Sequence, residues 1–560
     1  MSTTLSPRQQ AWVDSTFARL TLREKIGQTQ QERFNGFPDS KPETVERFFA
    51  ENPQGSLFCG GEIIKGSGSS ADTLREGLAL CQKWSKTPLL VAGDLESGAG
   101  AAVKSLTTFP SMMALGATRD PLSAYNYGRW TATEGRAAGF TWTFAPVVDL
   151  LRNWLNPVVS NRCLGDDPEN VIALATAVIR GMQENGLCAC AKHFPGDGID
   201  FRDQHLVTSI NSLPEKEWFA TFGRVFQSAI DAGVYSIMIG HIALPWLEQI
   251  APGARRVRPA TASSKILQEL LRERMGFEGV IVSDALQMAG ITGWAPYEER
   301  TLEAFNAGVD VMLWPGPRYI PLIERAIEEG KVTIERLDES VRRVLTLKAR
   351  LGLCDLAADG SDPRATPLAG SKLAPELDTQ VRSAAHDVAE KSLTLVRNER
   401  RLLPLAPSKI KRILLHAAVN PTKGRKDSID LLAELLRARG IEVTQIENGN
   451  CLDLWNLEDA GERWDAYLVV FSLQIHQAKN IVRPVGEMAE VMWTLQNSDT
   501  TQPIVISLGT PFLLNDMPYL HTLVNTYSPS EGSLTALDKA LFGEIPFAGT
   551  SPVNPGGNWV

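Results

Sequence analysis

The chain has 560 residues, of which 43% are hydrophobic and 22% charged, a globular composition that excludes disordered, collagenous and fibrous proteins. Lysine and arginine number 56 against 65 acidic residues, so the formal charge of -9 lacks the basic footprint of a nucleic-acid binder. The length allows three or four ordinary domains, or two if one of them is an α/β barrel of about 250 residues.

The seven cysteines are scattered, with no CxxC pair and no spacing typical of a zinc site. We therefore expect reduced, mostly buried thiols, and neither a metal nor another cofactor. No stretch reaches about 18 uninterrupted apolar residues, and the first residues have neither a basic n-region nor an apolar h-region. The expected location is the cytoplasm, with no membrane partner, and the oligomeric state is left open.

From Ile26 to Leu313, short apolar runs alternate with longer stretches of helical period, which predicts βα units and a parallel sheet. The eight runs begin at Ile26, Gly55, Pro88, Thr141, Leu187, Tyr235, Gly279 and Val309. Several are apolar without alternation, as strands covered on both faces must be. Helices are predicted from Pro168 to the Asn185-Gly186 stop and from Ser264 to Gly276. Eight strands with intervening helices favour a (β/α)8 TIM-type barrel over an open sheet.

Two helical stretches follow, starting at Pro321 and Arg336, and then a polar loop rich in Gly, Pro and Asp. Such a loop is typical of a domain boundary. Beyond it, the buried-type strands LLHAAV, AYLVVFSL and IVISLG are separated by helices such as SIDLLAELLRARG. We predict a barrel domain at 1–355, a linker at 356–375 and a smaller α/β sandwich domain at 376–560.

Ionisable residues follow several of the predicted strands at their carboxyl ends, where the active sites of TIM barrels form. They are Asp94, Glu96, Asp149, Lys192, His193, His241 and Asp284. The other ends of these strands carry mostly Gly, Pro, Thr and Leu. The pattern therefore favours an enzyme.

Most of these residues also have a structural interpretation. Asp284 could equally be the N-cap of the next helix. We interpret Asp149 as structural, and His241 as a buried histidine with satisfied hydrogen bonds rather than a catalytic one. Glu96 could pair with a base inside the barrel mouth.

The strongest local motif is AKHFPGDGIDFRDQH, in which a strand from Ala191 leads into a Pro- and Gly-rich loop that carries Asp203 and His205. An aspartate beside a histidine can fix the imidazole tautomer and stabilise its protonated form, as a general acid/base near neutral pH requires. A solvated polar loop and a metal site are the alternatives. The residues available to a metal, whose spacing matches no standard cation motif, are His193, Asp197, Asp203 and His205.

These motifs resemble glycoside hydrolase family 3, and within it the β-N-acetylglucosaminidase branch. KHFPGDGIDFRDQH resembles the KHFPGHG...DSH loop of that branch, and GVIVSDALQM resembles its nucleophile strand. GDLESG with FPSMMALGAT is similar to the aspartate strand that holds the sugar, and APVVDLLRNWLNPVVSNRCLGDDPENV to the segment with a sugar-binding arginine. AEKSLTLVRNERRLLPL, PIVISLGTPFLL and ALFGEIPFAGTSPV resemble the family's second domain.

The resemblance implies that Asp284 is the catalytic nucleophile, His205 the general acid/base and Asp203 its orienting partner. The residues that would hold the sugar hydroxyls are Asp94, Arg162, Lys192 and His193. The implied activity is metal-independent, retaining hydrolysis that releases β-linked N-acetylglucosamine (GlcNAc) from short peptidoglycan or chitin fragments. The expected partner is thus a small carbohydrate.

Two other functions stay open at this point. A histidine repels an anionic acceptor less than a second carboxylate would, which keeps a phosphorylase possible. Departures from the family pattern keep a non-catalytic sugar-binding protein possible. Asp197 stands where the branch usually has a second histidine, Cys163-Leu164 replace a Ser-Phe pair, and the segment after Asp94 lacks the arginines of the usual QEGGRV stretch.

Overall fold

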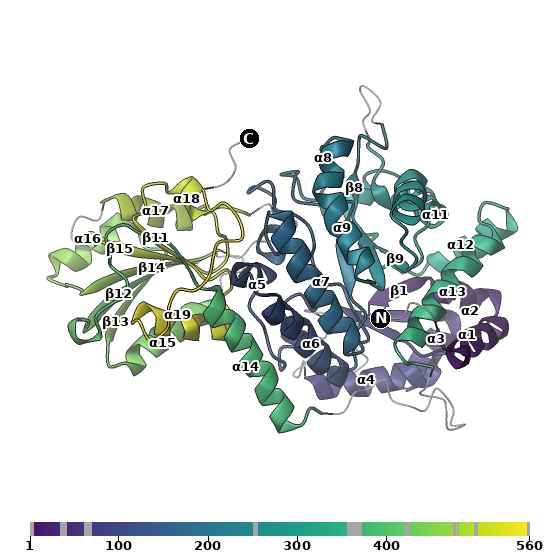
Figure 1. Cartoon of the computed structure of the whole chain (residues 1–560), viewed down its shortest axis with the longest axis horizontal. Coiled ribbons are helices and arrows are strands. Elements are labelled where there is room, and N and C mark those ends of the chain that lie inside the picture. Colours follow the sequence, from purple (N-terminus) through teal and green to yellow (C-terminus); the bar gives the residue numbers. More distant parts are fainter. Residues whose placement is uncertain are drawn as a thin grey trace.

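The computed structural model describes residues 5–33, 42–60, 70–249, 256–354, 372–419, 426–473, 478, 481–497 and 502–556. Figure 1 shows two parts side by side, with the N-terminal purple-to-teal part on the right and the green-to-yellow part on the left. Helix α14 (Pro375–Ser392) packs against α5 (Met112–Thr118) and α6 (Pro121–Ala138) of the first part and α19 (Glu531–Leu541) of the second. The predicted linker, 356–375, falls mostly on residues outside the described ones, so the domain boundaries stay predictions.

The first part is built around a curled parallel sheet. Its strands are β1 (Gln30–Arg33), β2 (Ser56–Phe58), β3 (Leu90–Gly93), β4 (Trp142–Thr143), β5 (Cys190–Phe194), β7 (Ser236–Ile239), β9 (Val280–Ser283) and β10 (Met312–Leu313). They form the orders β10-β1-β2-β3-β4 and β5-β7-β9, and single parallel bridges, Trp142–Cys188 and Val282–Val311, connect the two groups. The predicted α/β class is confirmed, and the curled sheet is consistent with a TIM-like barrel.

Helices surround this sheet, as the alternation of apolar runs and helical stretches predicts. They are α1 (Pro7–Arg19), α2 (Leu22–Gln28), α3 (Pro42–Glu51), α4 (Ala71–Trp84), α5, α6, α7 (Pro168–Glu184), α8 (Glu215–Ala220), α9 (Phe222–Asp231), η5 (Lys265–Arg274, wound as a π-helix), α10 (Ala289–Thr292), α11 (Tyr297–Ala307), α12 (Tyr319–Glu328) and α13 (Ile334–Arg350). Two more strands, β6 (Ser209–Ile210) and β8 (Ile242–Ala243), pair beside the main sheet.

The predicted start of the first strand at Ile26 is wrong, because that residue belongs to α2. A capping box begins this helix: the Thr21 side chain accepts from the Glu24 backbone N–H, and the Glu24 side chain accepts from the Thr21 backbone N–H. The strand starts only at Gln30. Local capping therefore outweighs the apolar pattern of the run.

The second part has a six-stranded sheet with helices packed on it. The strands are β11 (Thr394–Asn398), β12 (Arg412–Val419), β13 (Glu442–Glu447), β14 (Ala466–Ser472), β15 (Pro503–Ser507) and β16 (Thr522–Asn525), in the order β11-β16-β15-β14-β12-β13. The helices are α15 (Lys426–Ala438), α16 (Cys451–Asp459), α17 (Glu487–Asn497), α18 (Leu513–Asp516) and α19. Neighbouring residues of β12 point into different apolar clusters, Leu415 into one and Leu414 into another, so both faces of the sheet are covered.

Apolar packing joins the two parts close to the barrel mouth. One cluster combines Met113 of α5 and Val147 with Phe512 and Tyr527 of the second part. The Tyr527 carbonyl also accepts hydrogen bonds from Asn161 Nδ2 (3.0 Å) and a serine hydroxyl of the first part. Six of the seven cysteines are buried, and all seven are free thiols. None of the helices in the described ranges has the length and apolar character needed to span a membrane.

Candidate active site

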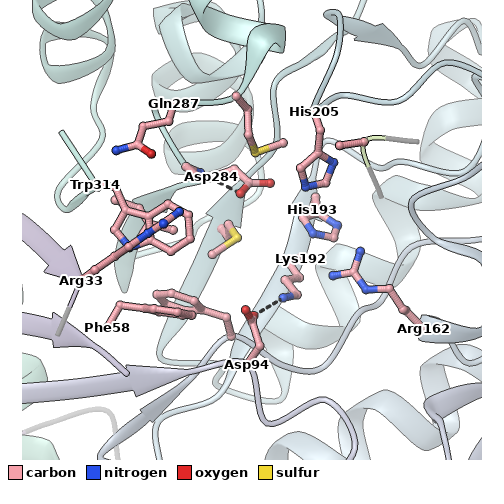
Figure 2. Close-up of a pocket in the computed structure, with 16 residues that line it drawn as sticks. Arg33, Phe58, Asp94, Arg162, Lys192, His193, His205, Asp284, Gln287 and Trp314 are labelled. Carbon is pink, nitrogen blue, oxygen red and sulfur yellow. Dashed lines mark hydrogen bonds and ion pairs between the residues drawn. The ribbon is translucent and has the colours of Figure 1, made fainter. Parts of the chain in front are cut away.

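A cavity of about 340 Å³ lies at the carboxyl ends of the parallel strands, within the usual size range of ligand sites. Six of the seven predicted site residues line it: Asp94, Arg162, Lys192, His193, His205 and Asp284. Figure 2 shows their side chains converging from different elements, with Asp284 between the histidines and Trp314. The seventh, Asp203, is not among the lining residues and supports His205 instead.

Asp203 and His205 form a hydrogen-bonded pair. Asp203 Oδ1 accepts from the imidazole Nδ1 (2.6 Å) and from the His205 backbone N–H (2.8 Å), while Oδ2 accepts from the backbone N–H of Ala478 (2.6 Å). Burial favours the neutral acid, but these bonds, led by that from His205, hold the pKa of Asp203 below its usual value. An ionised Asp203 fixes the hydrogen on Nδ1 and leaves Nε2 for the cavity that His205 lines.

Asp284 directly follows β9, and its carboxylate reaches the cavity. Its backbone N–H donates to the Ile239 carbonyl (2.9 Å), and its Oδ1 accepts from the Ala285 N–H (2.7 Å). Burial raises the pKa of Asp284, but the nearby histidines, led by His193, bring it below the usual value. The interpretation of Asp284 as a helix N-cap is wrong, because the next helix, α10, has Met288 at that position.

Asp94, Lys192 and Arg162 line one wall of the cavity and form a charge cluster with Glu96. Lys192 Nζ lies 2.8 Å from Asp94 Oδ1 and 2.6 Å from Glu96 Oε1. Arg162 donates to both carboxylate oxygens of Glu96, from Nε (2.9 Å) and Nη2 (2.7 Å). Burial opposes ionisation of Glu96, but Arg162 and Lys192 outweigh it and hold its pKa far below the usual range. Glu96 thus pairs with two cationic side chains, Arg162 and Lys192, and orients them toward the cavity that both line.

The buried Asp149 fixes His193 through hydrogen bonds. Asp149 accepts from His193 Nδ1 (2.7 Å), from the His193 backbone N–H (3.1 Å) and from the Asp197 backbone N–H (2.8 Å). These bonds are consistent with a structural role for Asp149. Burial and then the charge of Asp149 raise the pKa of Asp197 to about 7.

His241 is a buried histidine whose ring nitrogens are both satisfied, as expected. Nδ1 contacts the Thr261 hydroxyl (2.8 Å) and Nε2 the Ala285 carbonyl (3.0 Å). Burial lowers the pKa of His241. Its neutral ring supports the backbone next to Asp284 and does not line the cavity.

The opposite wall is aromatic, and our sequence analysis missed it. Phe58 stacks on Phe144 (ring centroids 5.7 Å apart) and meets Trp314 edge-on (5.2 Å). The Arg33 guanidinium lies 3.6 Å from the centre of the Trp314 ring. Phe144 and Trp314 occur in two of the predicted strand runs, so a search for aromatic as well as ionisable strand ends would have found them. Ala478, which reaches the cavity from the second part, has no such signal in the sequence.

A carboxylate, an oriented imidazole, a cluster of charged hydrogen-bonding groups and an aromatic wall suit a polyol ring better than a flat or extended ligand. The described residues contain no group of three or more His, Cys, Asp or Glu side chains arranged to hold a metal ion. Fold and site together define a carbohydrate-active enzyme of the TIM-like barrel class.

The family description "Glycosyl hydrolase family 3 N terminal domain" matches residues 21–347, more than half of the chain. The chain therefore belongs to glycosyl hydrolase family 3, and it is a glycosidase by family.

Several relatives extend the likeness over both parts. A beta-N-acetylglucosaminidase/beta-glucosidase from Cellulomonas fimi is 33% identical over 571 residues, which cover 97% of this chain and 95% of that protein. A solved structure of beta-glucoside phosphorylase BglX bound to 2FGlc is 30% identical, with a TM-score of 0.85 over 98% of this chain and 97% of the other. A family 3 beta-N-acetylglucosaminidase from Paenibacillus sp. str. FPU-7 is 26% identical, with a TM-score of 0.81 over 96% of this chain and 100% of the other.

Proposed function

We propose that this protein is a retaining β-N-acetylhexosaminidase that releases terminal β-linked GlcNAc from short peptidoglycan- or chitin-derived fragments. Relatives named for this activity support the sugar, above all the Cellulomonas fimi protein that matches nearly the whole chain. Asp284 acts as the nucleophile and His205 as the general acid/base, with Asp203 as its orienting partner. Asp94, Arg162, Lys192 and His193 hold the sugar hydroxyls.

In the first step, an Asp284 carboxylate oxygen attacks the anomeric carbon while His205 Nε2–H gives its proton to the departing glycosidic oxygen. The bond from the anomeric carbon to the leaving group breaks, and an ester to Asp284 forms. In the second step, neutral His205 takes a proton from water, whose oxygen displaces the Asp284 carboxylate. Two inversions at the anomeric carbon retain its configuration.

The observation that carries this proposal is that an ionised Asp284 and an Asp203-held His205 line one cavity beside the Lys192–Asp94 pair. A general acid/base must be protonated in one step and neutral in the next. A histidine suits this role because an imidazole titrates near pH 6.5 in water.

The test is cleavage of an aryl β-GlcNAc by the wild type and by Asp284→Ala. We expect the variant to be slower by at least about a thousandfold while its thermal unfolding is unchanged. Asp231→Ala, at the exposed end of α9, is the matched control. Mass spectrometry with 5-fluoro-GlcNAc fluoride should find the trapped sugar on the peptide that contains Asp284. Near-normal turnover by Asp284→Ala would contradict the assignment of Asp284 as the nucleophile.

A second candidate is phosphorolysis, in which a phosphate oxygen displaces the Asp284 carboxylate and GlcNAc-1-phosphate leaves. The likeness to a beta-glucoside phosphorylase and the use of a histidine in place of a second carboxylate favour it. Arg33 adds a cation at the cavity wall. Product analysis with and without inorganic phosphate decides between the two, since no GlcNAc-1-phosphate at any phosphate concentration would remove this candidate.

A further inference from the structure

Asp197 is a buried carboxylate in the loop between β5 and His205, and the proposed chemistry does not use it. It is 2% exposed and does not line the cavity. The flanking Gly196 and Gly198 have φ of 116° and 104°, which glycine adopts without strain, so this tight turn is what brings Asp197 inward.

The Asp197 carboxylate accepts three hydrogen bonds. Oδ1 accepts from Asn156 Nδ2 (2.7 Å) and the Gly198 backbone N–H (2.7 Å), and Oδ2 accepts from Gln204 Nε2 (3.1 Å). The Asn156 amide cannot turn over, because its Oδ1 already accepts from the backbone N–H groups of Val158 and Val159 (3.0 and 2.7 Å). The family loop that this segment resembles has a histidine here, and an imidazole offers at most one acceptor nitrogen. Only a carboxylate satisfies all three donors.

Gln204 connects Asp197 to the residue beside it, His205. Gln204 is fully buried, and its Oε1 accepts from the His241 backbone N–H (2.9 Å). A backbone N–H can only donate, so the amide group of Gln204 must face Asp197 with its NH2. The carbonyls of Gln204 and His205 accept from the backbone N–H groups of Gly290 (3.1 Å) and Ala289 (3.0 Å). The main chain that carries His205 is thus tied to the α10 segment, and the Gln204 side chain is tied to Asp197.

We propose that Asp197 is a positioning residue for His205, acting through Gln204 to set where the imidazole meets the glycosidic oxygen. The inference rests on the proposed acid/base role of His205. Loss of the Asp197–Gln204 bond should therefore impair proton donation to the leaving group. Attack by Asp284 should change less, because its carboxylate accepts from the Ala285 N–H and not from Asp197 or Gln204.

The hydrogen bond between Gln204 and Asp197 can be removed by changing either residue, and restored with the donor and the acceptor exchanged. In Asp197→Asn, the new NH2 faces the Gln204 NH2, and in Gln204→Glu two carboxylates face each other. In the double variant Asp197→Asn/Gln204→Glu, the asparagine donates to the glutamate, whose other oxygen still accepts from the His241 N–H. The double variant therefore restores one hydrogen bond and keeps one carboxyl group in the pair.

The assay compares 2,4-dinitrophenyl and 4-methylphenyl β-GlcNAc, because the first phenol leaves without protonation and the second needs the acid. We expect each single variant to lose at least about tenfold in kcat/KM on the 4-methylphenyl substrate and under about threefold on the other. We expect the double variant to return to within about threefold of the wild type on both. Thermal unfolding establishes that each protein is folded.

His205→Ala, measured in parallel, separates this inference from the proposed function. A loss in His205→Ala that is equal for both substrates would overturn the acid role and the inference with it. His205→Ala could instead lose activity mainly on the 4-methylphenyl substrate, while Asp197→Asn and Gln204→Glu lose it equally on both substrates or not at all. That result would overturn the role of Asp197 alone. Failure of the double variant to recover the 4-methylphenyl activity would also overturn it.

Discussion

Glu96→Gln tests whether the negative charge of Glu96 stabilises the charge cluster and orients Arg162 and Lys192. Glutamine keeps the shape of the side chain but removes its charge, so its NH2 group meets the donors of Arg162 or Lys192. The side chains of Glu96, Arg162 and Lys192 are 16%, 21% and 3% exposed, so solvent screens the pairs that Glu96 forms only a little. We expect both lower stability and weaker binding of the sugar.

The size of the effect follows from the contacts. Removing one partner of a buried ion pair costs about 3–5 kcal/mol. Lys192 keeps Asp94 and glutamine still accepts one bond, so we expect the lower end, about 3 kcal/mol, or about 6 °C in Tm at roughly 2 °C per kcal/mol for a large domain. We expect KM for an aryl β-GlcNAc to rise about tenfold, since about 1.4 kcal/mol of lost binding through a displaced Arg162 corresponds to that factor.

Glu169→Gln is the matched control, because Glu169 also forms a two-pronged pair with an arginine, Arg224, but at the surface. Those side chains are 66% and 51% exposed, and such pairs are worth at most about 1 kcal/mol. Calorimetry and Michaelis–Menten kinetics on both variants give the comparison. Equal shifts in Tm, or an unchanged KM in Glu96→Gln, would refute the reasoning.

Three further predictions concern the carboxylates of the site. Asp203→Asn can present its NH2 to His205 Nδ1 and favour the wrong tautomer, so kcat should fall by about 10²–10⁴ with little change in KM; a kcat within threefold of wild type would contradict this. Asp284→Ala, given the dinitrophenyl substrate and azide, should form the α-configured glycosyl azide, as judged by NMR, and a β product would exclude a nucleophile at this position. Burial and then Asp149 raise the pKa of Asp197 from an ordinary 3.8 to about 7. Its contribution to stability is therefore complete below about pH 4 and is lost as the pH rises through about 7. Urea unfolding between pH 5 and 8 should show a smaller fall in stability for Asp197→Asn, and a slope as steep as that of the wild type would disprove the shift.

Much of the first part could be predicted from local pattern. Short continuous apolar runs, such as that from Tyr235, are typical of strands covered on both faces, and the structure has β7 there. Asp167 and Pro168 begin α7 as expected, since the Asp167 side chain accepts from the Glu169 N–H and proline suits the first turn. Asp203 and His205 are two residues apart, so their pairing is a short-range property that the sequence already contains.

Tertiary structure alone decided the contacts between distant segments. Glu96 meets Arg162 across 66 residues of chain, and Ala478 meets Asp203 across 275. No local pattern encodes such meetings, because they depend on strand order and on how the second part packs against α5. The residue types at the strand ends determined which chemistry is available, whereas the curl of the parallel sheet determined which of those side chains share one cavity.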